Sequence, residues 1–144
     1  MTHHEHILVV DDEPGIRKLL QQYLSQHGYR VSVAANGEAM TRVLDEAARD
    51  GESPVDAVIL DLVMPGEDGL TLTRRLRQDF DVAIIILTLK DDAAHRVEGL
   101  ERGADDYITK PFNLRELHAR LKSVLRRTKA QPTAPARRGA DGPA

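Results

Sequence analysis

The sequence predicts an α/β protein built as one domain around a doubly wound parallel sheet. Five short apolar runs alternate with five longer segments of helical period, which is the pattern of repeated βα units. The central runs are apolar throughout, as expected for strands that helices cover on both faces. The 144 residues are 41% hydrophobic and include no cysteine, so the chain can bury one core, and disulfide bonds and thiolate chemistry are excluded.

The apolar runs are the expected strands, at residues 6–10, 30–34, 56–60, 83–87 and 106–108. The second run alternates between apolar and polar residues, which places it at an edge of the sheet. Each run is far shorter than the ~20 apolar residues that span a bilayer, and the first leads into acidic residues rather than a cleavage site. We therefore expect no membrane segment and a cytoplasmic location.

Five helices are expected from their start signals, at residues 14–27, 37–48, 68–78, 91–101 and 113–126. Pro14 stands in a first turn, Asn36 precedes its helix as a cap, and Asn113 forms a capping box with Glu116 three residues on. The last segment carries an apolar stripe, so this helix should pack on the sheet with its Arg and Lys residues outward.

Charge is divided unevenly along the chain, although the net charge is only −3. Residues 1–114 carry a charge of −9 and residues 115–144 a charge of +6. The positive residues begin on an expected helix and are not interleaved with aromatic residues, so direct DNA binding by this chain is not expected. Residues 128–144 are rich in Ala, Pro and Gly and cannot contribute to a core. We therefore expect a domain at 1–127 followed by a disordered linker or tail.

Polar side chains stand where the expected strands end, at Asp11, Asp12, Asp61, Thr88 and Lys110. In a doubly wound sheet these ends form the edge at which ligands bind. Each residue alone has an ordinary structural explanation: Asp12 could cap a helix, for example, and Asp61 could pair with Lys110. Together they bring three carboxylates, a hydroxyl and an ammonium group to one patch.

Three neighbouring carboxylates repel one another, and one lysine does not balance them, so a divalent cation is expected. Ligation by oxygen alone suits Mg²⁺, which usually shares its site with a phosphate. Asp61 ends the central strand and is the best-placed nucleophile for an aspartyl phosphate, with Asp11 and Asp12 holding the metal. Thr88 and Lys110 are then expected to bind the phosphoryl oxygens.

Four motifs resemble those of a CheY-like receiver domain of a two-component response regulator, and their combination is highly specific. The motifs are Val9-Val10-Asp11-Asp12-Glu13, Leu60-Asp61 with Met64-Pro65-Gly66, Leu87-Thr88, and Lys110-Pro111-Phe112. The resemblance covers residues 5–127 and implies a flavodoxin-like fold with strand order 2-1-3-4-5. It also implies a switch rather than a conventional enzyme, because such a domain catalyses only its own Mg²⁺-dependent phosphorylation and dephosphorylation.

The resemblance assigns roles to the residues of the acidic patch. It implies an aspartyl phosphate on Asp61, received from a sensor histidine kinase. Mg²⁺ would be held directly by Asp12, Asp61 and the backbone carbonyl of Val63, and by Asp11 largely through water.

Two further residues match the family's switch pair, Thr88 and Tyr107. In the family, phosphorylation draws the threonine toward the phosphoryl group, and the aromatic ring moves into the vacated space. Leu89 departs from the pattern, because the family usually has a small residue there. A leucine could narrow access to Asp61.

The segment 103–112 most resembles the OmpR/PhoB branch, whose regulators join a receiver to a winged-helix DNA-binding domain. That branch implies transcriptional output through a domain absent from this chain. It also implies a homodimer, formed on phosphorylation through the fourth helix, fifth strand and fifth helix. The matching intermolecular ion pairs are Arg96 with Glu116, Asp106 with Arg120, and Glu101 with Lys122. Two of these residues, Glu116 and Arg120, are also spaced i, i+4 and could pair within one helix.

Other interpretations stay open. A stand-alone receiver that acts as a phosphorelay carrier or partner-binding module would have the same features. A phosphatase of the haloacid-dehalogenase type would need a second acid where Val63 stands, and a flavodoxin-type flavin site would need a Gly- and Ser-rich loop in place of residues 11–14. His3, His4 and His6 invite a metal-site interpretation, but their place at the N-terminus favours a mobile segment without fixed geometry.

Overall fold

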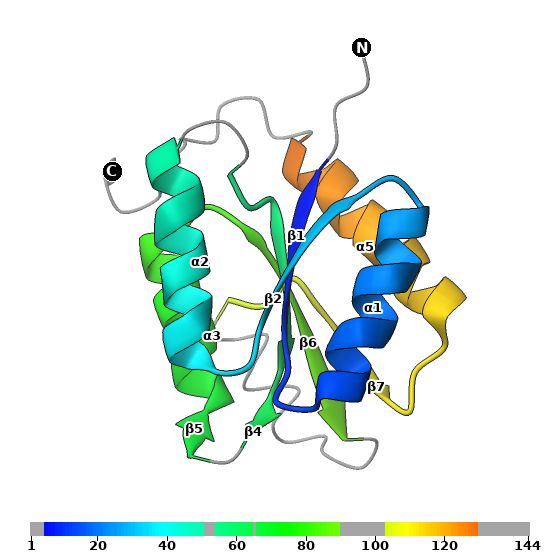
Figure 1. Cartoon of the computed structure of the whole chain (residues 1–144), viewed down its shortest axis with the longest axis horizontal. Helices are drawn as coiled ribbons and strands as arrows, with labels where there is room; N and C mark the ends of the chain where they lie inside the picture. Colours follow the sequence, from blue (N-terminus) through cyan, green and yellow to red (C-terminus); the bar gives the residue numbers. More distant parts are fainter. Residues whose placement is uncertain (1–4, 51–53, 65, 90–102, 130–144) are drawn as a thin grey trace.

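A five-stranded parallel sheet lies at the centre of the computed structural model, which describes residues 5–50, 54–64, 66–89 and 103–129. The strands are β1 (His6–Val10), β2 (Arg30–Ala34), β3 (Ala57–Asp61), β6 (Ala83–Leu89) and β7 (Asp106–Lys110). The helices are α1 (Pro14–Gln26), α2 (Gly37–Asp50), α3 (Gly69–Asp79) and α5 (Leu114–Lys129). Figure 1 shows α2 and α3 on one face of the sheet and α1 and α5 on the other. The strand order β2-β1-β3-β6-β7 confirms the predicted topology and the edge position of β2.

The structure differs from the prediction mainly around the strand ends. β6 and β7 each continue two residues further than expected, so Thr88 and Lys110 lie inside strands rather than after them. An unpredicted antiparallel ladder of β4 (Val63–Met64) and β5 (Glu67–Asp68) follows β3. Strands of two residues have no periodicity for a sequence pattern to reveal, and Gly66, with a φ of 75°, provides their turn.

The remaining boundaries are close to the predicted ones. The ends of β3 and of the four described helices shift by one to three residues, as is usual for frayed ends. Asn36 Oδ1 accepts a hydrogen bond from the amide of Ala39 at 2.8 Å, and Asn113 Oδ1 accepts one from the amide of Glu116 at 3.0 Å. Both predicted caps are thereby confirmed. The helix expected at 91–101 lies outside the described residues.

Two apolar layers, one on each face of the sheet, make up the core. Alternate side chains of β1 point to opposite faces: Ile7 and Val9 pack in the layer of α1 and α5, whereas Leu8 and Val10 pack in the layer of α2 and α3. All four are fully buried. Because helices cover both faces, the central strands offer polar groups to a ligand at their ends. No helix in the described ranges is long and apolar enough to cross a membrane.

An ionic network, which we call the amino-edge network, lies where the strands begin. Arg77 of α3 donates through Nη2 to Asp105 Oδ2 at 2.7 Å, and through Nε and Nη2 to the carbonyl of Gly103 at 3.0 and 2.8 Å. Asp105 Oδ2 also accepts from the amide of Ile84 in β6 at 2.8 Å. Gly103 has a φ of 122°, and a Cβ there would lie 2.8 Å from the Arg77 side chain. The network ties α3 to β6 and to the residues before β7.

Candidate functional site

The ends of β1, β3, β6 and β7 meet at one edge of the sheet, which we call the carboxyl edge. Parallel pairing aligns the end of β1 with that of β3, so Asp11 and Asp61 are neighbours in register. Thr88 and Lys110 stand near the ends of the paired strands β6 and β7. The register thus brings together side chains as far apart in sequence as Asp11 and Lys110, which are separated by 99 positions.

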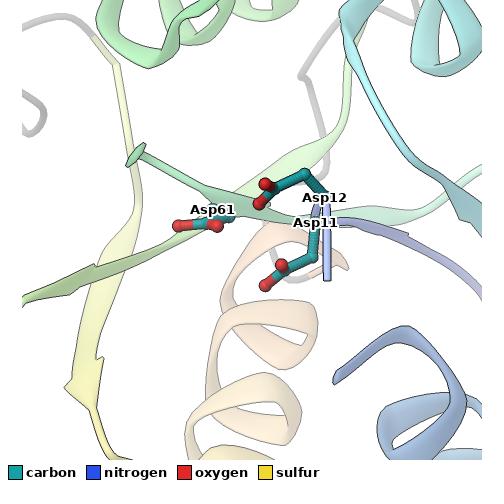
Figure 2. A group of neighbouring side chains, drawn as sticks. All are labelled: Asp11, Asp12 and Asp61. Atoms are coloured by element: carbon teal, nitrogen blue, oxygen red, sulfur yellow. The ribbon is translucent and has the colours of Figure 1, made fainter. Parts of the chain in front are cut away.

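Three carboxylates, those of Asp11, Asp12 and Asp61, form what we call the acidic cluster. Each offers one oxygen, and these oxygens lie within 4.8 Å of one another. Figure 2 shows the three side chains gathered at the ends of β1 and β3. Asp11 is 0% and Asp61 3% exposed. Because buried like charges at this spacing repel one another, the donor set fits a hard divalent cation bound by oxygen.

Lys110 places a positive charge inside the acidic cluster. Its Nζ lies 3.2 Å from Asp11 Oδ2 and 3.3 Å from Asp61 Oδ2. Burial would lower the pKa of Lys110, but the carboxylates of Asp61 and Asp11 outweigh burial and raise this pKa above its usual value. Lys110 is therefore protonated at neutral pH. Its ion pair with Asp61, considered above as a structural alternative, is present and belongs to the cluster.

Thr88 brings a buried hydroxyl to the same edge. The residue is 1% exposed, and its Oγ1 has no hydrogen-bond partner within the described part of the chain. Leaving a buried hydroxyl without a partner costs about 1–3 kcal/mol. Such groups are uncommon in folded proteins, and this one fits a hydrogen bond to an anionic ligand oxygen at the carboxyl edge.

Hydrogen bonds hold the turn between β1 and α1, which carries two of the three acids. Asp11 Oδ1 accepts from the amide of Glu13 at 2.9 Å, and the amide of Asp11 donates to the carbonyl of Ala34 in β2 at 3.1 Å. Arg17 Nη1, one turn into α1, donates to the carbonyl of Asp11 at 2.8 Å. The sequence analysis missed Arg17, because only the folded turn shows which acceptor an arginine at this helix position reaches.

The segment after Asp61 packs closely on the sheet. The amide of Leu62 donates to the carbonyl of Leu87 at 2.9 Å, and a Cβ at Gly69 would lie 2.5 Å from the carbonyl oxygen of Leu62. Only a glycine at the start of α3 permits this approach. The metal-binding role of the Val63 carbonyl stays a prediction. The expectation that Leu89 narrows access to Asp61 stays a prediction, because the Leu89 side chain is outside the part of the chain that the structure describes.

Both predicted switch residues lie on one face of the sheet. Tyr107 of β7 is half-buried and packs against the layer of α2 and α3. Side chains alternate along β6, so Thr88 points to the same face as Ile86, which belongs to that layer. Because β6 and β7 are paired, the two residues stand on neighbouring strands.

The predicted dimer residues are described only in part, because Arg96 and Glu101 lie outside the described residues. Arg120 Nη1 donates to both carboxylate oxygens of Asp106 at 3.0 Å, and Arg120 Nε donates to Glu116 Oε2 at 3.2 Å. Arg120 therefore has both acidic partners within its own chain, including the i, i+4 pair. Pairing between two chains stays a prediction.

Of the three N-terminal histidines, the structure describes His6. It is buried in β1, and its Nε2 is hydrogen-bonded to Ser32 Oγ at 2.7 Å. His3 and His4 lie outside the described residues. The ring of His6 thus belongs to the contact between β1 and β2, at the end of the sheet opposite the acidic cluster.

Comparisons with known proteins agree with this geometry. The family model described as "Response regulator receiver domain" matches residues 7–122. Transcriptional regulatory protein AruR of Pseudomonas aeruginosa is 52% identical over 133 residues, which are 91% of this chain and 54% of that protein. TorCAD operon transcriptional regulatory protein TorR of Escherichia coli O157:H7 is 46% identical over 120 residues, 83% of this chain and 50% of that protein. The chain spans about half the length of these curated relatives.

Solved structures show the same fold. The crystal structure of the receiver domain of the TMAO respiratory system response regulator TorR has a TM-score of 0.79 and 44% identity, and the match covers 86% of this chain and 98% of that one. The Francisella response regulator 1452 receiver domain has a TM-score of 0.71 and 31% identity, with 87% and 99% covered.

Proposed function

The chain belongs to the family of response regulator receiver domains, and from this premise we propose that it is a phosphorylation switch that accepts a phosphoryl group on Asp61 from a sensor histidine kinase. The observation that carries the proposal is the surroundings of Asp61. Its buried carboxylate lies in the acidic cluster and 3.3 Å from the ammonium group of Lys110. A nucleophile, a cation site and a fixed positive charge are what phosphoryl transfer to a carboxylate requires.

In the proposed reaction, a carboxylate oxygen of Asp61 attacks the phosphorus of a phosphohistidine and forms an O–P bond as the P–N bond breaks. The imidazole leaves with the electron pair of that bond and takes up a proton from water. Lys110 keeps its positive charge beside the incoming phosphoryl oxygens, and the hydroxyl of Thr88 donates to one of them. The domain thus catalyses its own phosphorylation and is not a conventional enzyme.

The acidic cluster fits Mg²⁺ as the cofactor of this reaction. When bound, the ion supplies positive charge that offsets the phosphoryl oxygens. Asp12, Asp61 and the backbone carbonyl of Val63 would hold it directly. Both oxygens of Asp11 already accept hydrogen bonds, from Glu13 and from Lys110, which favours contact through water for this residue.

For the output, we propose transcriptional control through a winged-helix DNA-binding region joined to the receiver after α5, which ends at Lys129, two residues beyond the expected domain boundary. The relatives AruR and TorR are transcriptional regulatory proteins about twice as long as the matched region, which supports this output over a stand-alone relay carrier. Thr88 and Tyr107 would couple the phosphoryl group to the face of β7 and α5, where two copies associate. The cytoplasmic location stays a prediction.

Intact-mass spectrometry tests the phosphorylation. The protein and Asp61→Asn are incubated with a small acyl phosphate donor, with and without Mg²⁺. The proposal expects the mass of one phosphoryl group on the wild-type protein, and only with Mg²⁺. A phosphoryl group that appears equally on Asp61→Asn would overturn the assignment of the acceptor.

Sedimentation of the phosphorylated protein tests the dimer. Arg120 would exchange Asp106 of its own chain for Asp106 of the second copy, so Arg120→Ala should weaken self-association. Arg126→Ala, an exposed arginine on the same helix, is the matched control. A sedimentation profile that Arg120→Ala leaves unchanged would remove the case for an ion-paired face.

A further inference from the structure

Arg17 reaches from α1 back to the turn that carries two acids of the cluster. Its side chain is half-buried, and its Nη1 donates to the carbonyl oxygen of Asp11 at 2.8 Å. The contact joins a charged donor to a backbone oxygen rather than to a carboxylate. Hydrogen bonds from charged donors are the stronger kind, so this bond holds the carbonyl of Asp11 firmly.

The orientation of Asp12 depends on that carbonyl. The carbonyl group of Asp11 and the amide group of Asp12 belong to one planar peptide unit, so a donor that holds the oxygen also sets where the next side chain starts. None of the described residues donates a hydrogen bond to the Asp12 carboxylate itself. Its position within 4.8 Å of the other two acids therefore rests on the backbone of the turn.

The other hydrogen bonds of the turn act on different groups. The amide of Asp11 is bound to Ala34, and its two carboxylate oxygens are bound to Glu13 and Lys110. These bonds hold the end of β1 and the side chain of Asp11. The peptide unit that leads to Asp12 has Arg17 as its donor.

We propose that Arg17 is a positioning residue for the cation site: it pins the peptide unit between Asp11 and Asp12 so that the Asp12 carboxylate faces Asp61. The inference rests on the proposed function, because it concerns Mg²⁺ bound at the acidic cluster. Arg17 does not touch the ion or the phosphoryl group. It acts on them through the backbone of the turn.

If Arg17 acted only through its charge, its replacement would change the Mg²⁺ affinity in the opposite direction from that expected for a positioning residue. A positive charge near the site repels Mg²⁺, so its removal alone would tighten binding. Loss of the hydrogen bond lets the peptide unit rotate, so the Asp12 carboxylate is no longer held in one orientation and the affinity for Mg²⁺ falls. Residues that orient metal ligands are worth about 10- to 100-fold in metal affinity. The direction of the change therefore separates positioning from simple electrostatics.

The test is isothermal titration of Mg²⁺ into the wild-type protein, Arg17→Met, Arg17→Lys and Lys18→Met. Lys18 is the next residue on α1, and its exposed side chain forms no hydrogen bond or ion pair with another described residue, so its replacement removes the same charge without disturbing the turn. We expect Arg17→Met to raise the Mg²⁺ dissociation constant about 10-fold. Lys18→Met should leave it unchanged or lower it. Arg17→Lys, which keeps a charged donor, should fall between wild type and Arg17→Met.

A second readout separates positioning from damage to the fold. With Asp61, Thr88 and Lys110 intact, Arg17→Met should reach the wild-type phosphorylation rate at saturating Mg²⁺ and differ only in the Mg²⁺ concentration required. A dissociation constant for Arg17→Met equal to that of Lys18→Met, or lower, would overturn the inference. If circular dichroism shows that Arg17→Met does not fold, Arg17→Lys serves as the test variant. An Mg²⁺ affinity of Arg17→Lys equal to that of the wild-type protein, together with a lowered unfolding midpoint, would contradict a positioning role. Absence of Mg²⁺ binding by the wild-type protein would instead refute the proposed cation site, and the role of Arg17 with it.

Discussion

Two ionic networks lie at opposite edges of the sheet, and their charges are balanced differently. In the amino-edge network, one arginine faces one aspartate, and Asp105 Oδ2 takes a backbone amide as its second donor. At the carboxyl edge, Lys110 is paired with two of the three clustered carboxylates, those of Asp11 and Asp61, and the hydroxyl of Thr88 has no partner among the described residues.

We interpret the difference as one between a group of residues that stabilises the fold and a group whose charges and donors fit a bound ligand. A complete network lowers the free energy of the folded chain and leaves no capacity for further binding. An incomplete one raises that free energy and leaves negative charge and a free donor for a cation and an anionic group. Excess charge, and a buried hydroxyl with no partner among the described residues, are thus the features that point to the carboxyl edge as the candidate site.

The largest effect is expected from Asp61→Asn, which should abolish phosphorylation. The same change removes one of three repelling charges, so the urea midpoint of the variant in the absence of Mg²⁺ should rise. Mass spectrometry and urea unfolding measure the two effects on one sample. A lowered midpoint would mean that Asp61 stabilises the fold through Lys110 and that the carboxyl edge resembles the amino edge.

Arg77→Met should cause the largest loss of stability. The variant keeps the apolar stem but removes the guanidinium donor of Asp105 and of the carbonyl of Gly103, so Asp105 Oδ2 keeps only the amide of Ile84. Breaking a buried ion pair costs about 3–5 kcal/mol, and because these side chains are 18% and 33% exposed, solvent reduces the expected loss to about 2 kcal/mol. Urea unfolding measures it, with the exposed Arg74→Met as control. Phosphorylation of Asp61 should be unaffected, and a loss of phosphorylation in the folded variant would contradict the division between the two edges.

Thr88→Val should stabilise the unphosphorylated protein by about 1 kcal/mol, because it removes, at nearly constant volume, a buried hydroxyl that has no partner among the described residues. Phosphorylation should be slower, since a donor to the phosphoryl group is lost. Thr73→Val is the matched control, because Thr73 is also fully buried but donates to the carbonyl of Gly69 at 2.8 Å. The two variants should shift the unfolding midpoint in opposite directions. A destabilised Thr88→Val would show that this hydroxyl is bonded in solution.

The smallest effect is expected from His118, on α5 and away from both networks. Burial, with the nearby charges of His27 and Lys122, lowers the pKa of His118 below its usual 6.5. The unfolded chain therefore takes up this proton more readily, and stability should fall as the pH drops below about 6.5 until the lower folded-state pKa is passed. Urea midpoints between pH 7.5 and 5 should decline less steeply for His118→Gln than for wild type. Parallel declines would exclude His118 as the cause.

The strand order was expected from the resemblance of four motifs to the receiver family. The sequence by itself determined the fold class, the edge position of β2 and the identity of the residues at the carboxyl edge. These follow from local patterns: apolar runs of strand length, helix caps such as Asn36, and polar residues where runs end. Buried positions recur with a period that can be seen in the sequence, so the strands can be located from it. Because the strands are parallel, their carboxyl ends then lie at the same edge of the sheet. Asp11, Asp61, Thr88 and Lys110 could be predicted as one site for that reason.

The tertiary structure alone decided which donor meets which acceptor. The spacing of residues does not reveal that Lys110 pairs with both Asp11 and Asp61 or that Arg17 reaches a backbone carbonyl. Nor does it reveal that the Thr88 hydroxyl finds no partner in the described part of the chain. Hydrogen bonds depend on angles and on distances of a few ångströms between side chains far apart in sequence, whereas hydrophobic burial depends only on which face a residue occupies. The hydrophobic pattern of the sequence therefore predicts the layers of the fold, whereas the hydrogen bonds and ion pairs of the site are known only from the tertiary structure.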